Sequence, residues 1–70
     1  MNYLLEALIK KLEGDIAVAK ANIMVYQRSA TGIGEHPEVV QAIESQVEII
    51  ANAEDKLNAI HNHFGHGQEK

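Results

Sequence analysis

One short string that holds two glycines and the only proline constrains this chain most, because it separates two long segments of helical periodicity. The string reads Gly32-Ile33-Gly34-Glu35-His36-Pro37. Glycine supplies the positive φ that a helix C-cap and a tight turn require. Proline fits the first turn of a helix, where its missing N–H is not needed. We therefore predict a turn at Gly32 and Gly34 and a second helix that begins at Pro37.

Apolar residues recur in steps of three and four on both sides of this turn, which is the period of one helical face. The first face consists of Leu5, Leu8, Leu12, Ile16, Ala19, Ile23, Tyr26 and Ala30. The second face consists of Val40, Ile43, Val47, Ile50, Ala53, Leu57, Ile60 and Phe64. Gly65 then acts as a stop signal. The pattern predicts two helices, at about residues 3–29 and 37–64.

The predicted helices are similar in length, and each would extend roughly 40 Å at 1.5 Å per residue. A connection this short makes two helices antiparallel neighbours. The sequence therefore predicts an all-α fold, a two-helix antiparallel hairpin. Its domain would cover residues 1–64, followed by a polar C-terminal tail at residues 65–70.

A single hairpin leaves much apolar surface uncovered, because two helices bury side chains along one seam only. Apolar residues outside the two faces include Leu4, Ile9, Val18 and Val25 in the first segment, and Val39, Ile49 and Ala51 in the second. An exposed patch of this size marks an interaction site. We expect hairpins to associate into a helical bundle, most simply a homodimer of four helices. The residues expected at the core and oligomer seam are Leu8, Leu12, Ile16, Ile23, Ile43, Val47, Ile50 and Leu57.

Charge is distributed unevenly between the two helices. Residues 1–30 carry four basic and three acidic side chains, whereas residues 35–64 carry one lysine and six carboxylates. This asymmetry favours the first helix lying beside the second, both within a hairpin and across a dimer. The net charge of −4 and the lack of a Lys/Arg cluster argue against nucleic-acid binding.

Composition excludes several other classes of protein. Aliphatic residues are too plentiful for a disordered chain, since 46% of the residues are hydrophobic. The absence of cysteine excludes disulfide scaffolds and cysteine-ligated metal sites. The apolar stretches are too short for a signal peptide or a membrane span. We expect a cytoplasmic protein with no membrane partner.

Three C-terminal histidines are the candidates for a metal site. His61, His63 and His66 form the pattern H-x-H-x-x-H, and clustered imidazoles can bind a divalent ion. The spacing does not suit a helix, because residues two apart point to different sides. A site would need an unwound helix end or ligands from another subunit.

No catalytic constellation is apparent. A di-iron bundle requires Glu-x-x-His with both side chains directed inward, and no glutamate here has a histidine three residues later. The hydroxyl candidates Ser29, Thr31 and Ser45 have no recognisable charge-relay partners. We therefore predict no catalytic residue, no cofactor and no enzymatic activity.

Three strings resemble a family of short, uncharacterised reading frames of marine tailed phages, including cyanophages, and of marine metagenomes. They are Val25-Tyr26, the turn from Gly32 to Pro37, and Ala53-Glu54-Asp55-Lys56-Leu57. The similarity covers about residues 5–60, and the turn is its specific part. Members often carry Asn-Pro before the glycine pair, where this chain has Ala30-Thr31. The resemblance implies a phage accessory or virion-associated role in a host cell, and it carries over no catalytic residue.

The sequence thus favours a self-associating, non-enzymatic helical protein that acts through protein–protein contacts. A first alternative is a metal-binding bundle that uses the C-terminal histidines. A second alternative is an adaptor or inhibitor that binds a host protein through the acidic face of the second helix, which carries Glu44 and Glu48.

Overall fold

The computed structural model describes residues 3–30 and 37–65, and these residues are helical throughout. Helix α1 runs Tyr3–Ala30 and helix α2 runs Pro37–Ile60. A π-helical turn, η1, continues α2 over His61–Gly65. The prediction of an all-α fold with two helices is confirmed. The turn glycines Gly32 and Gly34 lie outside the described residues.

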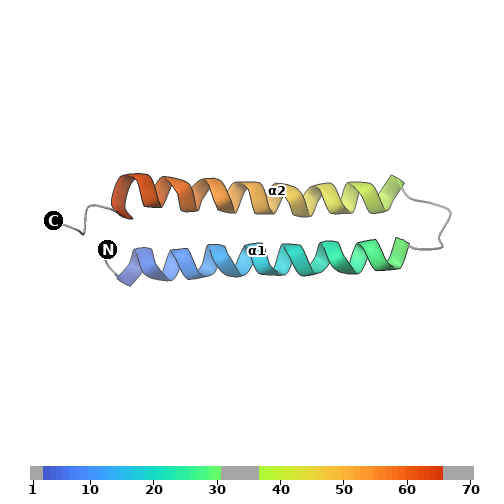
Figure 1. Cartoon of the computed structure of the whole chain (residues 1–70), viewed down its shortest axis with the longest axis horizontal. Coiled ribbons are helices and arrows are strands. Elements are labelled where there is room, and N and C mark those ends of the chain that lie inside the picture. The colour runs from blue at the N-terminus through green and yellow to red at the C-terminus, as the bar shows by residue number, and fades with distance from the viewer. Residues whose placement is uncertain (1–2, 31–36, 66–70) are drawn as a thin grey trace.

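The two helices lie side by side along their length and run in opposite directions (Figure 1). The start of α1 therefore lies beside η1, at the end opposite the connection (Figure 1). The molecule extends 57 Å along its longest axis and 15 and 14 Å along the others. A body only two helices wide has one internal seam, so most side chains must keep contact with solvent.

The seam follows a strict alternation of four-residue and three-residue steps in both helices. All of its members are buried or half-buried. In α1 they are Leu5, Ile9, Leu12, Ile16, Ala19, Ile23 and Tyr26, and in α2 they are Val39, Ile43, Gln46, Ile50, Ala53, Leu57 and Ile60. A repeat of seven residues with two inward positions is the pattern of a coiled coil. The hairpin is thus a short antiparallel coiled coil.

The core is small. Leu12, Ala53 and Ile60 form its buried cluster, and Ile9, Ile16 and Leu57 pack against them. Ala19 is also buried, farther along α1. Leu12 and Ile9 pack in one cluster with Ala53 and Leu57, and Asn22 is hydrogen-bonded to Gln46, so a residue n of α1 lies within about one helical turn of residue 66 − n of α2.

Burial differs from the expected apolar faces at four positions. Val40 is 59% exposed and Phe64 is 52% exposed. The other two positions belong to the expected seam. Leu8 is 40% exposed and Val47 is 50% exposed, whereas their neighbours Ile9 and Gln46 are half-buried. The alternation of four-residue and three-residue steps places residues 9 and 46 inward, although residue 46 is polar. The other six expected seam residues, Leu12, Ile16, Ile23, Ile43, Ile50 and Leu57, are buried or half-buried.

The π-helical turn η1 that follows α2 is wider than an α-helix. Gly65 is buried in this turn, and a Cβ at this residue would lie 3.1 Å from the Nδ1 atom of His61. The missing side chain therefore makes room for the His61 ring. The regular α-helix ends at Ile60, four residues before the expected end at residue 64.

We predict that Ala53→Leu destabilises the protein by about 1–3 kcal/mol, because the added methylenes overpack a closed seam. Ala53 is 3% exposed within the buried cluster. The matched control is Ala51→Leu, at an exposed position of the same helix, which should change the stability by less than about 0.5 kcal/mol. Urea unfolding measures both variants. Equal effects at residues 51 and 53 would contradict the assignment of the seam.

Candidate interaction surface

A groove between the helices contains an interhelical hydrogen bond between two side-chain amides. Asn22 Nδ2 donates to Gln46 Oε1 over 3.1 Å, and both residues are half-buried. The groove is lined by Asp15, Val18, Ala19 and Asn22 from α1, and by Gln46 and Ile49 from α2. A polar pair at the edge of an apolar seam favours one register over its neighbours, because a slip would break this hydrogen bond.

This groove identifies one side of the hairpin, which we call the apolar flank. Its positions lie one residue before each seam position. They are Leu4, Leu8, Lys11, Asp15, Val18, Asn22 and Val25 in α1, and Glu38, Ala42, Ser45, Ile49, Asn52, Lys56 and Ala59 in α2. Five of these residues, Leu4, Leu8, Val18, Val25 and Ile49, are exposed large hydrophobics.

The apolar flank carries two positive and two negative side chains, so its net charge is zero. Lys11 Nζ lies 2.9 Å from Asp15 Oδ2, so these two residues form an ion pair on the surface of α1. Glu38 and Lys56 are the other two charged residues among its positions, and they lie far apart in α2. The flank thus has no net charge, and the middle of its α2 half carries no carboxylate.

The opposite side of the hairpin, the charged flank, consists of the positions one residue after the seam. They are Glu6, Lys10, Glu13, Ala17, Lys20, Met24 and Gln27 in α1, and Val40, Glu44, Val47, Ala51, Glu54, Asn58 and His61 in α2. Four carboxylates and two lysines give this flank a net charge of −2. Lys10 Nζ lies 3.9 Å from Glu13 Oε1 there, with both side chains largely exposed. Met24, Val40 and Val47 on this flank are also exposed large hydrophobics. The two sides of one hairpin therefore differ in net charge and in the number of exposed large hydrophobics, which is five on the apolar flank and three on the charged flank.

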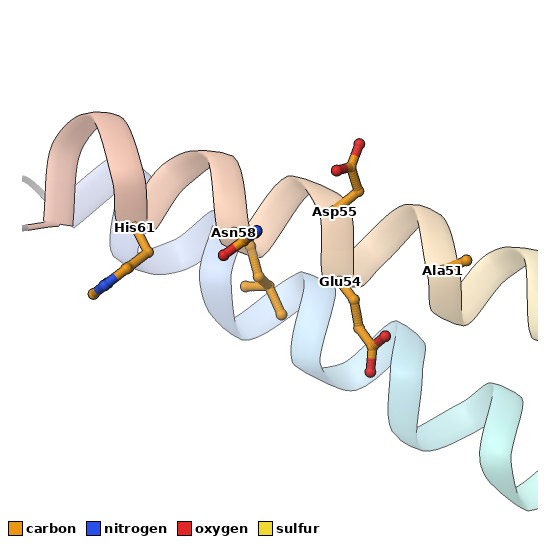
Figure 2. Close-up of a pocket in the computed structure, with 6 residues that line it drawn as sticks. Ala51, Glu54, Asp55, Asn58 and His61 are labelled. Carbon is orange, nitrogen blue, oxygen red and sulfur yellow. The ribbon is translucent and has the colours of Figure 1, made fainter.

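A shallow hollow on the charged flank is lined by polar side chains but does not bring them together. It involves Glu54, Asp55, Asn58 and His61, with Ala51 and Leu57. Figure 2 shows the carboxylates of Glu54 and Asp55 pointing in opposite directions, with the His61 ring directed away from both. No three histidine or acidic residues of the described segments converge in a way that could hold a metal ion.

The histidine candidates are placed by the π-helical turn. His61 and His63 both lie in η1, and the His63 ring contacts the Phe64 ring edge-on at a centroid distance of 6.4 Å. His66 lies outside the described residues. In the described part of the chain, His61 and His63 belong to no group of three or more histidine or acidic side chains that could hold a metal ion.

The hydroxyl candidates are on the surface. Ser45 Oγ donates to the backbone carbonyl oxygen of Gln41 over 3.2 Å, which satisfies the hydroxyl within its own helix. Ser29 is exposed near the end of α1, and Thr31 lies outside the described residues. The arrangement of the described hydroxyls thus suggests no nucleophile paired with a base.

Sequence reasoning missed the pairing of Asn22 with Gln46. The available signal is that both polar residues interrupt otherwise apolar helix faces at positions that the antiparallel register brings level. Sequence reasoning identified seven apolar residues outside the main faces. The structure places Leu4, Val18, Val25 and Ile49 on the apolar flank, Ile9 and Val39 in the seam, and Ala51 on the charged flank.

Comparisons with known proteins give no relationship from which a role could be transferred. No protein-family model matches the chain, and the searches of curated proteins and of solved structures also find no match. In the described segments, neither helix combines the length and apolar character that crossing a membrane requires.

We predict that the amides of Asn22 and Gln46 are energetically coupled. In a double-mutant cycle of Asn22→Ala and Gln46→Ala, each single change should cost about 1–2 kcal/mol, because it leaves a half-buried amide without its partner. The double variant should lose less than the sum, with a coupling of roughly 0.5–1.5 kcal/mol. Urea unfolding of the four proteins at one concentration measures the cycle. Strict additivity would show that the hydrogen bond adds nothing to stability.

Proposed function

We propose that this chain is a small, non-enzymatic protein that associates with itself and acts through protein–protein contacts. Its working unit is a homodimer in which two hairpins form a four-helix bundle. The observation that carries this proposal is the imbalance between buried and exposed apolar side chains. The described residues include four buried hydrophobic residues, two of them alanines, and ten large hydrophobics that remain exposed.

Association resolves this imbalance because it supplies the burial that one seam cannot. Chains of this size seldom bury enough surface alone and commonly gain stability by oligomerisation. Helical hairpins with an unused apolar side pair readily into four-helix bundles. The helices also differ in charge, with an excess of one positive charge over residues 1–30 and of five negative charges over residues 35–64. A bundle that alternates α1 and α2 around its axis separates the two acidic helices.

The biological setting that we propose rests on the resemblance of the turn and flanking strings to short reading frames of marine tailed phages. A phage accessory or virion-associated protein that acts in the cytoplasm of a host cell is consistent with a small bundle that lacks a catalytic constellation in its described residues. The bundle would then present its charged surface to a phage or host protein.

We predict that the stability of the wild-type protein depends on its concentration. When folding is coupled to association, mass action raises the Tm with protein concentration. Each tenfold increase should raise the Tm by roughly a few degrees. Circular dichroism melts over three decades of concentration measure this shift. A folded chain whose Tm is independent of concentration would contradict self-association.

The variant Ile50→Asp tests the same proposal at a half-buried seam position. A carboxylate there would be buried without a partner, so helicity and assembly should be lost together. Gln41→Asp introduces the same charge at an exposed position of the same helix and should preserve both. A folded Ile50→Asp protein of unchanged mass would refute the coupling between the seam and assembly.

A further inference from the structure

We infer that the second copy docks on the apolar flank, with α1 of one hairpin lying over α2 of the other. This inference rests on the proposed self-association and specifies its interface. The charged flank and the outward surfaces of both helices then remain available to solvent or to a different partner.

The free-energy cost of removing charged side chains from water favours the apolar flank over the charged flank as the dimer interface. Docking the charged flank would bury four carboxylates and two lysines against the same six charges of a second copy. Charges buried without close partners cost several kcal/mol each. The apolar flank carries four charges in all, and Lys11 and Asp15 already form an ion pair at 2.9 Å. Its five exposed large hydrophobics, against three on the charged flank, gain free energy when they leave water.

Side-chain size indicates which helices face each other across the dimer. On the apolar flank, α1 presents four exposed large hydrophobics, Leu4, Leu8, Val18 and Val25. Among the described positions of α2, the flank has one, Ile49, together with the small residues Ala42, Ser45 and Ala59 and the polar residues Glu38, Asn52 and Lys56. Large residues pack well into the spaces over small ones. Placing α1 over α1 would oppose large residues to large ones and leave gaps between the two α2 helices.

A two-fold axis along the bundle produces this arrangement. Such an axis keeps every residue at its own level, so the correspondence between residue n and approximately residue 66 − n also applies across the dimer. Val18 would then lie near the second copy's Ile49, Val25 near its Ala42, and Leu8 near its Ala59. Every adjacent pair of helices would be one α1 and one α2, which places the acidic α2 helices on a diagonal.

The groove also explains why a second copy, rather than an unrelated chain, fits this flank. A two-fold dimer must pair a surface with itself, and two features of this flank suit such pairing. Its net charge is zero, and four of its five exposed large hydrophobics lie on α1, where Leu8 and Val25 are level with the smaller Ala59 and Ala42 of α2.

Single cysteines test this interface without removing a core side chain, since the chain has no cysteine of its own. Val18→Cys and Ile49→Cys lie on the apolar flank, and Val47→Cys is the matched control on the charged flank. Val18 and Val47 are 61% and 50% exposed in a single hairpin. In the assembled protein, a thiol at residue 18 or 49 should react with a maleimide roughly tenfold or more slowly than one at residue 47, because the interface protects it.

Crosslinking between two different variants tests the helix pairing. Val18→Cys carrying a size tag is mixed with untagged Ile49→Cys, refolded together and treated with a short thiol-to-thiol crosslinker. We expect a mixed crosslinked dimer in excess of either homodimer, and no crosslink from Val47→Cys to either variant. A crosslink that forms mainly between two copies of the Val18→Cys variant would overturn the pairing of α1 over α2.

The thiol-labelling rates and the concentration dependence of the Tm together distinguish a wrong choice of flank from a failure of the proposed self-association. Rapid labelling at residues 18 and 49, with protection at residue 47 and a Tm that depends on concentration, would overturn the choice of flank and leave self-association intact. Equal rapid labelling at all three residues, with a Tm that does not depend on concentration, would overturn both.

Discussion

The structure depends on the fact that two paired helices share only one seam. In this hairpin the seam takes two positions out of every seven in each helix, and the other five keep contact with solvent. The described core therefore contains Leu12, Ala53 and Ile60 as a cluster, with Ala19 farther along. Every other property of the molecule follows from how it distributes the apolar residues that this seam cannot hold.

The two sides of the seam receive different residues. Positions one residue before the seam carry five exposed large hydrophobics and four charges, whereas positions one residue after it carry three exposed large hydrophobics and six charges. This difference would have no energetic consequence if both sides stayed in water. It favours one interface when a second hairpin docks, because burying six charges of net −2 would cost more free energy than burying four charges that balance. The same asymmetry leaves an acidic surface for other contacts.

The helices could be predicted from periodicity and from the position of Pro37, because both signals are local and agree with each other. The seam itself was harder to place. Leu8 and Ile9 are both apolar, so hydropathy alone does not choose between them, and Val47 looks a better seam residue than Gln46. The structure selects Ile9 and Gln46, which keep the alternation of four and three. Gln46 is tolerated because Asn22, a residue from the other helix, satisfies its amide oxygen. This hydrogen bond depends on the antiparallel register of the two helices, which the sequence of either helix alone does not determine.

The central claim is that one hairpin is half of the folded unit, and the most direct test is its mass in solution. Multi-angle light scattering over a concentration series, with and without a chelator, gives that mass. We expect twice the chain mass of 7.7 kDa, unchanged by the chelator, with dissociation only at the lowest concentrations. A folded particle of 7.7 kDa at every concentration would contradict the account, because the exposed apolar side chains would then be reserved for a different protein.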